Sequence, residues 1–129
     1  MIVYLAGPIN GCGDDHAVAW RQQFKALRPD LEYLDPMRRD CRGIEDQNVQ
    51  AIIDGDIADI DACDVFVANC WQVSWGTAME VFYAHRNGKT VVLVVPEGHR
   101  ISPWLRGHSH EIHPTIQAAA ASLGPQLGP

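Results

Sequence analysis

Short runs of almost wholly apolar residues are the feature that most constrains the fold of this 129-residue chain. Three of them cover residues 2–6, 65–68 and 90–95, and segments with apolar side chains at helical spacing lie between them. A run in which consecutive residues are apolar, rather than alternate ones, is typical of a parallel strand that is covered on both faces. Strands of this kind joined by helices predict an α/β fold with one doubly wound parallel sheet.

A weaker strand and several helices complete the predicted architecture. The first helix is expected to be capped by Asp14 or Asp15 and to end at Pro29. The other expected segments are a strand over residues 31–34, helices over 44–62, 76–87 and 115–123, and an irregular polar stretch over 96–114. The sheet then has about four or five strands in the order 2-1-3-4-5, a flavodoxin-like or Rossmann-like arrangement. Residues 1–123 are expected to form one domain, with residues 124–129 as a disordered tail.

The helix over residues 44–62 combines an apolar face with many carboxylates. Val49, Ile53 and Ile57 recur at a spacing of four residues, which predicts that this face is buried. The aspartates on the other positions are typical of solvated or capping residues. Gly55 indicates a break or a close contact just before Asp56, which slightly favours Asp56 as a functional carboxylate.

Residues 74–80 follow the carboxyl end of a predicted strand, where open α/β sheets bind ligands. Ser74 and the free backbone N–H groups at the start of the next helix suit a phosphate. Glu80 lies among apolar side chains, and a carboxylate in such surroundings is typical of a nucleophile, acid or base. The glycine-rich loop over residues 7–13, unless it is an ordinary turn, should face this segment across one crevice.

Arg38, Arg39 and Arg42 lie within five residues of one another, after the second predicted strand. Guanidinium groups clustered in one loop predict a lid over an anionic ligand. The alternative is a solvated turn in which Asp35 and Asp40 balance the arginines.

Composition excludes several classes of function. A net charge of −6 with a pI of about 5.3 argues against a general nucleic-acid surface. No apolar stretch approaches the roughly 20 residues that cross a bilayer, so we expect no membrane partner. Four cysteines without C-x-x-C spacing, and a start without a signal peptide, favour a reduced cytoplasmic protein.

Histidines near the C-terminus offer a different enzyme class. His99, His108, His110 and His113 have spacings that resemble metal ligands and would suit a metal-dependent hydrolase. The segment lacks a regular periodicity that would fix their geometry, so we favour solvated or interface histidines. Neither a metal nor a cofactor is therefore expected.

The order and spacing of four motifs resemble the nucleoside 2-deoxyribosyltransferase superfamily from residue 1 to about residue 95. The motifs are Tyr4-Leu5-Ala6-Gly7-Pro8-Ile9, Asp56 with Asp64 eight residues later, Ser74-x-Gly-Thr-x-x-Glu80, and Gly88-Lys89. The superfamily contains transferases that exchange bases between deoxynucleosides. It also contains N-glycosidases that hydrolyse nucleoside 5′-monophosphates to free base and sugar phosphate.

The resemblance implies a role for each matching residue. Glu80 matches the nucleophile that attacks the anomeric carbon and forms a covalent glycosyl-enzyme. Asp56 matches the aspartate that assists proton transfer at the leaving base, and Tyr4 matches the aromatic residue that orients the nucleophile. The residues expected to surround the substrate are Gly7, Pro8, Ile9, Asn10, Gly11, Ser74, Gly76 and Thr77.

Ser74 distinguishes the two branches of the superfamily. Nucleoside-using transferases typically carry an aspartate six residues before the nucleophile, whereas nucleotide-using N-glycosidases carry a serine there. An aspartate would repel a phosphate in a poorly solvated pocket, while a serine hydroxyl can donate to it. We therefore expect hydrolysis of a nucleoside or deoxynucleoside 5′-monophosphate through a covalent intermediate on Glu80. The alternatives are base exchange between deoxynucleosides and, less favoured, a non-catalytic nucleotide-binding module.

The chain departs from the family pattern at Pro8 and Asn10, where nucleotide hydrolases often carry Ser and Arg. Part of the phosphate grip is then expected from Arg38, Arg39 or Arg42. Family members are dimers or larger, and the segment after the fourth strand completes a neighbour's site. The resemblance thus implies a homodimer or higher oligomer with Ser102, His108 and Ser109 as contributors.

Overall fold

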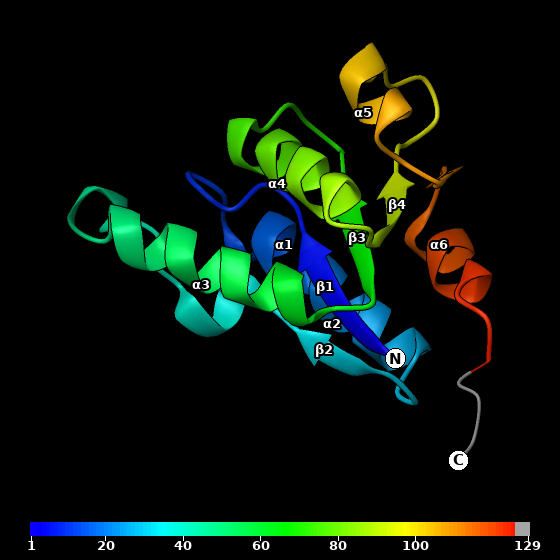
Figure 1. Cartoon of the computed structure of the whole chain (residues 1–129), viewed down its shortest axis with the longest axis horizontal. Coiled ribbons are helices and arrows are strands. Elements are labelled where there is room, and N and C mark those ends of the chain that lie inside the picture. The colour runs from blue at the N-terminus through cyan, green and yellow to red at the C-terminus, as the bar shows by residue number, and fades with distance from the viewer. Residues whose placement is uncertain (126–129) are drawn as a thin grey trace.

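The computed structural model describes residues 1–125 and contains one parallel sheet. Its strands are β1 (Ile2–Ala6), β2 (Glu32–Leu34), β3 (Val65–Asn69), β4 (Thr90–Val94) and β5 (Glu111–His113). The strand order is β2-β1-β3-β4-β5, and every neighbouring pair is parallel. The predicted α/β class and the predicted order 2-1-3-4-5 are therefore confirmed (Figure 1).

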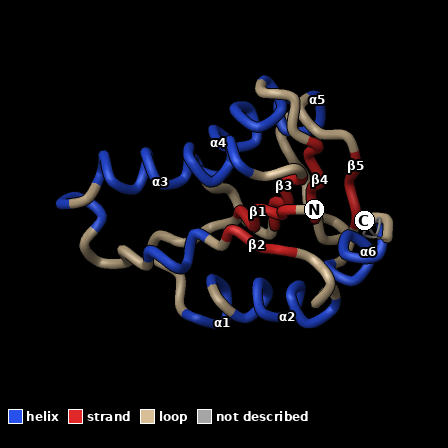
Figure 2. The backbone as a smooth tube through the Cα atoms, turned by 60° about the horizontal axis from the view of Figure 1, so that its bottom comes forward, coloured by secondary structure: helices blue, strands red, loops and turns tan. Residues whose placement is uncertain are grey.

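Helices cover both faces of the sheet (Figures 1 and 2). One face carries α1 (Asp14–Ala17), α2 (Ala19–Leu27) and α6 (Ile116–Ser122), and the other carries α3 (Val49–Ala62), α4 (Trp75–Arg86) and α5 (Pro103–Gly107). Two short 3-10 helices, η1 (Pro36–Arg39) and η2 (Glu45–Gln47), lie between β2 and α3.

Alternate residues of the strands point into two separate cores. Val3 and Leu5 of β1 pack with Phe24 of α2, whereas Tyr4 of β1 packs in the cluster that contains Val81 of α4. A side-chain period of two along a strand produces this division. Tyr4 consequently faces the layer of α3 and α4.

Several predicted helices and strands differ from the structure, and the helix predicted over residues 44–62 begins only at Val49. The first predicted helix is divided at Val18 into α1 and α2, and its N-cap is Gly13, with both aspartates in the first turn instead. The stretch predicted to be irregular contains α5 and β5. β5 escapes prediction because it is a three-residue edge strand in which only Ile112 is apolar.

The apolar face of α3 is not buried as predicted. Val49 and Ile53 are exposed, whereas Ile60 in the last turn is buried in the core. The N-terminal half of α3 projects beyond the sheet, so no strand lies beneath it (Figure 1). The apolar side chains of this half are left on the surface of the chain.

A buried arginine ties the end of β1 to α2. Nε of Arg21 donates to the carbonyl of Leu5 at 3.1 Å, and Nη2 donates to the carbonyl of Gly7 at 3.3 Å. Asp35 lies 3.6 Å from the same guanidinium and balances its charge. These contacts satisfy a group that would be costly to bury alone, and they fix the loop that leaves β1.

The remaining observations concern the C-terminal tail and the possibility of a membrane-spanning helix. Residues 126–129 of the predicted disordered tail lie outside the described residues. In the part of the chain that the structure describes, no helix has both the length and the apolar character needed to cross a bilayer.

Candidate active site

A cavity of about 960 Å³ lies between α3, α4 and the segment over residues 99–108. Its walls are mostly apolar, with aliphatic side chains from α3 and aromatic side chains from α4 and α5. The predicted site residues that line it are Asp56, Ser74, Gly76, Thr77, Glu80, Ser102 and His108. A cavity of this size and character is typical of a small-molecule site.

Ser74 begins α4 by capping it. Its Oγ accepts hydrogen bonds from the backbone N–H of Thr77 at 3.3 Å and from Oγ1 of Thr77 at 3.0 Å. Serine is a favoured N-cap because its oxygen satisfies a backbone donor that the helix cannot. Both bonds use Ser74 as an acceptor, so its own hydroxyl proton can still be donated to a ligand.

Glu80 is held by Tyr4 across the wall of the cavity. The Tyr4 hydroxyl donates to Oε2 of Glu80 over 2.5 Å, and the Tyr4 ring stacks on Phe66 at a centroid distance of 5.4 Å. Burial, followed by the charges of Glu80 and Asp56, raises the pKa of Tyr4 far above its usual range. Tyr4 therefore stays neutral and donates. Among the described residues, Oε1 of Glu80 has no hydrogen-bond partner.

Glu80 and Asp56 are both harder to ionise than ordinary carboxyl groups. Burial and then the charge of Asp56 raise the pKa of Glu80 to about 8. Burial also raises the pKa of Asp56, although Arg39 opposes this shift. Two such groups in one cavity suit a division of labour in which one is ionised while the other carries a proton.

The three arginines of the predicted lid already have carboxylate partners. Arg38 and Arg39 pair with aspartates of α3, and Nη2 of Arg42 lies 2.6 Å from Asp40 and 2.8 Å from Asp14. None of the three lines the cavity formed by the described residues. Nearby carboxylates thus balance the charge of Arg42, as in the alternative of a solvated turn, whereas Arg38 and Arg39 lie against α3.

The loop after β1 lies beside the loop after β3. Nε2 of Gln72 lies 3.9 Å from Sγ of Cys12, and the ring of His16, in α1 just after the first loop, stacks on Trp71 at 4.6 Å. A Cβ on Gly7, at the start of this loop, would lie 3.1 Å from Trp20 and 3.3 Å from the carbonyl of Asn69, so glycine lets these segments approach closely. None of the predicted residues of the loop, which are Gly7, Pro8, Ile9, Asn10 and Gly11, lines the described cavity.

The segment that contains Ser102, His108 and Ser109 lies against α4 of the same chain. Ser102 caps α5 by accepting from the N–H of Trp104, and the Ser109 hydroxyl donates to the carbonyl of Arg106. The His108 ring stacks on Trp104 at 5.7 Å. Within residues 1–125, the histidines of this region do not form a group that could hold a metal ion.

Sequence reasoning missed several parts of the site. Arg100 lines the cavity, and so do Phe82 and Trp104. Their positions depend on how α5 packs against α4, which no local pattern reveals. Gly55 did carry a signal, since the close contact that it indicated is with the Arg39 side chain.

Comparison with known proteins decides the family. The sequence profile of the family described as nucleoside 2-deoxyribosyltransferase matches residues 3–120. The chain belongs to this family. The family supports glycosyl transfer or hydrolysis at the bond between a sugar and a base as the chemistry of the chain. No curated protein matches the chain.

Three of the solved structures that share the fold come from bacteria. A 2-deoxyribosyltransferase from Bacillus psychrosaccharolyticus has a TM-score of 0.76 and 17% identity, over 94% of this chain and 91% of that one. A conserved protein from Enterococcus faecalis V583 has a TM-score of 0.75 and 16% identity, over 92% of this chain and 94% of that one. The CMP N-glycosidase BcmB from Clostridium botulinum has a TM-score of 0.66 and 18% identity, over 95% of this chain and 98% of that one. At these identities the similarity to the three structures shows a shared fold alone.

Proposed function

We propose that the protein hydrolyses the N-glycosidic bond of a nucleoside or deoxynucleoside 5′-monophosphate, with free base and sugar 5-phosphate as products. The observation that carries this proposal is the placement of Glu80. Its carboxylate lines the cavity, accepts from Tyr4 through one oxygen, and shares the cavity with Asp56. An attacking carboxylate with a second carboxyl group nearby is the arrangement that glycosidic cleavage uses.

The reaction needs one proton shared between the two carboxyl groups. Ionised Glu80 attacks the anomeric carbon while the C–N bond breaks, and the bonding electrons go to the base, which takes a proton from Asp56. Water then attacks the glycosyl ester. The ionised Asp56 accepts a proton from that water, and Glu80 leaves as a carboxylate. Both pKa values are raised by burial, which favours a cavity that holds one proton near neutral pH.

The start of α4 supports a phosphate-bearing substrate. Ser74 has a free hydroxyl proton there, and the first backbone N–H groups of a 12-residue helix favour an anion. Among the described residues, Asp56 and Glu80 are the two that line the cavity with a carboxyl group. Ser74 is uncharged, so its side chain does not repel a phosphate at the start of α4. The name of the CMP N-glycosidase from Clostridium botulinum indicates that this fold can serve nucleotides.

Base exchange between deoxynucleosides is the second candidate, and the cavity size favours it. A volume of about 960 Å³ with apolar walls leaves room for a second base after the first departs. A transferase would release little base in water and much more when an acceptor base is added. A non-catalytic binding module would retain a nucleotide without turnover, and Glu80→Gln would change nothing.

Product analysis tests the proposal directly. We expect chromatography to show equal amounts of free base and sugar 5-phosphate from at least one monophosphate in a panel of ribo- and deoxyribonucleotides, without an added acceptor. Release that depends steeply on an acceptor base would support the transferase instead. No release from any nucleotide or nucleoside would leave the hydrolase proposal without support.

The rate of base release should follow the form of the cavity in which Glu80 and Asp56 share one proton. The kcat/KM should rise as the first of the two carboxyl groups ionises, pass through a maximum, and fall through about pH 8 as the last proton is lost, because burial raises the pKa of Glu80 to about 8. Tyr4→Phe removes a hydrogen bond that lowers the pKa of Glu80, so the falling limb should move to higher pH. Phe66→Leu, which alters the packing of the Tyr4 ring but not the hydrogen bond, serves as the control. A Tyr4→Phe profile that superimposes on the wild type would contradict this role.

We also propose that a second copy of the chain covers the open side of the cavity. Trp75, Met79 and Trp104 are 88%, 73% and 70% exposed, and the last two line the cavity. The exposed apolar half of α3 adjoins the same cavity through Ile53. Large apolar side chains that cluster at a surface are typical of a subunit interface.

Met79→Glu should dissociate this dimer. An unpaired carboxylate in an apolar interface costs several kcal/mol, and each 1.4 kcal/mol is tenfold in the dissociation constant. Light scattering should show a dimer for the wild type and a monomer for Met79→Glu, with base release reduced about tenfold or more. Gln23→Glu on α2, on the opposite face of the sheet, adds the same charge and should change neither property. A wild type that is monomeric at assay concentration and fully active would rule out a shared site.

A further inference from the structure

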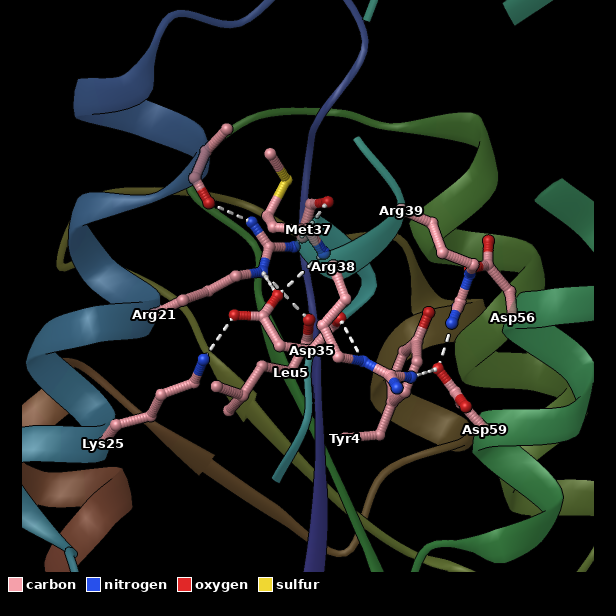
Figure 3. Close-up of polar contacts among 12 residues, drawn as sticks. Tyr4, Leu5, Arg21, Lys25, Asp35, Met37, Arg38, Arg39, Asp56 and Asp59 are labelled. Carbon is pink, nitrogen blue, oxygen red and sulfur yellow. Dashed lines mark hydrogen bonds and ion pairs between the residues drawn. The ribbon is translucent and has the colours of Figure 1, made fainter. Parts of the chain in front are cut away.

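Arg39 lies between Asp56 and a second carboxylate of α3. Nη2 of Arg39 is 3.2 Å from Oδ1 of Asp56 and 2.8 Å from Oδ2 of Asp59. Arg38 reaches the same oxygen of Asp59 at 2.5 Å, so the two arginines of η1 converge on α3 (Figure 3). Charge-assisted bonds of this kind hold η1 against the helical turn that carries Asp56.

Gly55 provides the space in which the Arg39 guanidinium lies. A Cβ on Gly55 would be 2.6 Å from Nε and 3.0 Å from Cζ of Arg39. Contacts that short do not occur, so any other residue at this position would push the guanidinium away from the backbone of α3. Glycine inside a helix is unfavourable, which makes a packing role the physical reason for its presence.

The backbone that carries Arg39 is itself fixed. Asp35 caps η1 by accepting from the N–H of Met37 at 2.8 Å. Asp35 is buried, and Nζ of Lys25 lies 2.6 Å from its second oxygen, with Nε of Arg21 at 3.6 Å from the first. Figure 3 shows these pairs as one series from α2 through η1 to α3. Arg39 therefore projects from a segment that cannot easily shift.

We propose that Arg39 is a positioning residue, which holds the Asp56 carboxylate in place at the cavity wall through the space that Gly55 leaves. The proposal deepens the proposed function and rests on it, because Asp56 is there the group that transfers the proton. Arg39 does not line the described cavity, so it acts through Asp56 rather than on the substrate.

The charges around Asp56 set the sign of the expected effect. Tyr4 of β1, Glu80 of α4 and Asp59 of its own helix surround Asp56 together with Arg39. Burial raises the pKa of Asp56, and Arg39 lowers it both by its hydrogen bond and by its charge. Displacing Arg39 should therefore raise the pKa of Asp56 further.

The test combines a direct titration with kinetics in Arg39→Met, Arg39→Lys and Gly55→Ala. Carbon-13 NMR of the aspartate carboxyl groups, assigned with Asp56→Asn, should show a higher pKa for Asp56 in Arg39→Met and Gly55→Ala. The kcat for base release should fall about tenfold or more in these two variants with little change in KM, and Arg39→Lys should retain an intermediate rate.

Gly55→Ala removes no charge, so a shift in the pKa of Asp56 in that variant reports the position of Arg39 alone. Gly124→Ala, where nothing lies within 4 Å of a new Cβ and which does not line the cavity, is the control and should match the wild type.

Two results separate this proposal from the proposed function. If Gly55→Ala is more thermostable than the wild type, as alanine in a helix should be, and its Asp56 titration is unchanged, the positioning role is overturned. If no substrate releases base but Asp56 still shifts in Arg39→Met and Gly55→Ala, the positioning role stands and the proposed function fails.

Discussion

Replacing Glu80 by glutamine is expected to reduce base release by about 10⁴-fold or more, because the variant has no carboxylate to form the covalent intermediate. Glutamine has nearly the same shape, and its side-chain oxygen can still accept from Tyr4. The loss should therefore appear in kcat, while binding of the monophosphate, measured by calorimetry, should change little. Retention of a substantial rate in Glu80→Gln would show that another residue attacks the sugar.

The same variant should be more stable than the wild type at high pH. Burial and Asp56 raise the pKa of Glu80 from 4.5 to about 8 on folding, so the folded state holds this proton more tightly than the unfolded state. The wild type should therefore lose stability as the pH rises from 4.5 through about 8, and Glu80→Gln should not. Above pH 8 we expect a gain of about 1–2 kcal/mol in urea unfolding, which disappears below pH 4.5. Lower stability of the variant at pH 9 would contradict the raised pKa.

Ser74→Asp is expected to have the second largest effect, by excluding the phosphate. A carboxylate about 4 Å from a phosphate charge costs on the order of 4 kcal/mol near a protein surface, which corresponds to about 10³-fold. The kcat/KM for the monophosphate should fall by about 10²- to 10³-fold after screening, while that for the matching nucleoside should not fall. Aspartate caps a helix as well as serine, so α4 should stay intact.

Ser74→Ala separates charge from the loss of a hydroxyl. It removes the acceptor of the Thr77 N–H, so the protein should lose about 1 kcal/mol of stability. It brings no negative charge, so it should retain far more monophosphate activity than Ser74→Asp. Equal activity of the two variants would mean that Ser74 does not face a phosphate.

Some parts of the site could be predicted because they depend on the chain near one strand. Ser74 and Glu80 follow β3, and the apolar run of β3 placed them at the carboxyl edge of the sheet. Tyr4 came from the resemblance to the family, and the alternation of side chains along β1 explains why it faces the layer of α4. The strand order followed from the same apolar runs.

Other parts depend on contacts between segments that are distant in sequence. The Arg39 pair with Asp56 spans 17 residues, and an arginine-rich loop alone does not show whether its partner is a phosphate or a carboxylate. The exposure of Val49 and Ile53 could not be predicted either, since helical periodicity identifies an apolar face but not what covers it. β5 was hidden because a short edge strand buries little apolar surface.

The ratio of kcat/KM for a monophosphate to that for its own nucleoside tests the central claim most directly. Free base should be quantified for both substrates in the wild type, in Glu80→Gln and in Ser74→Asp, without an acceptor base. The proposed function predicts a large ratio in the wild type, a much smaller one in Ser74→Asp, and no release in Glu80→Gln. A ratio near or below one in the wild type would contradict it and would favour a nucleoside as the substrate.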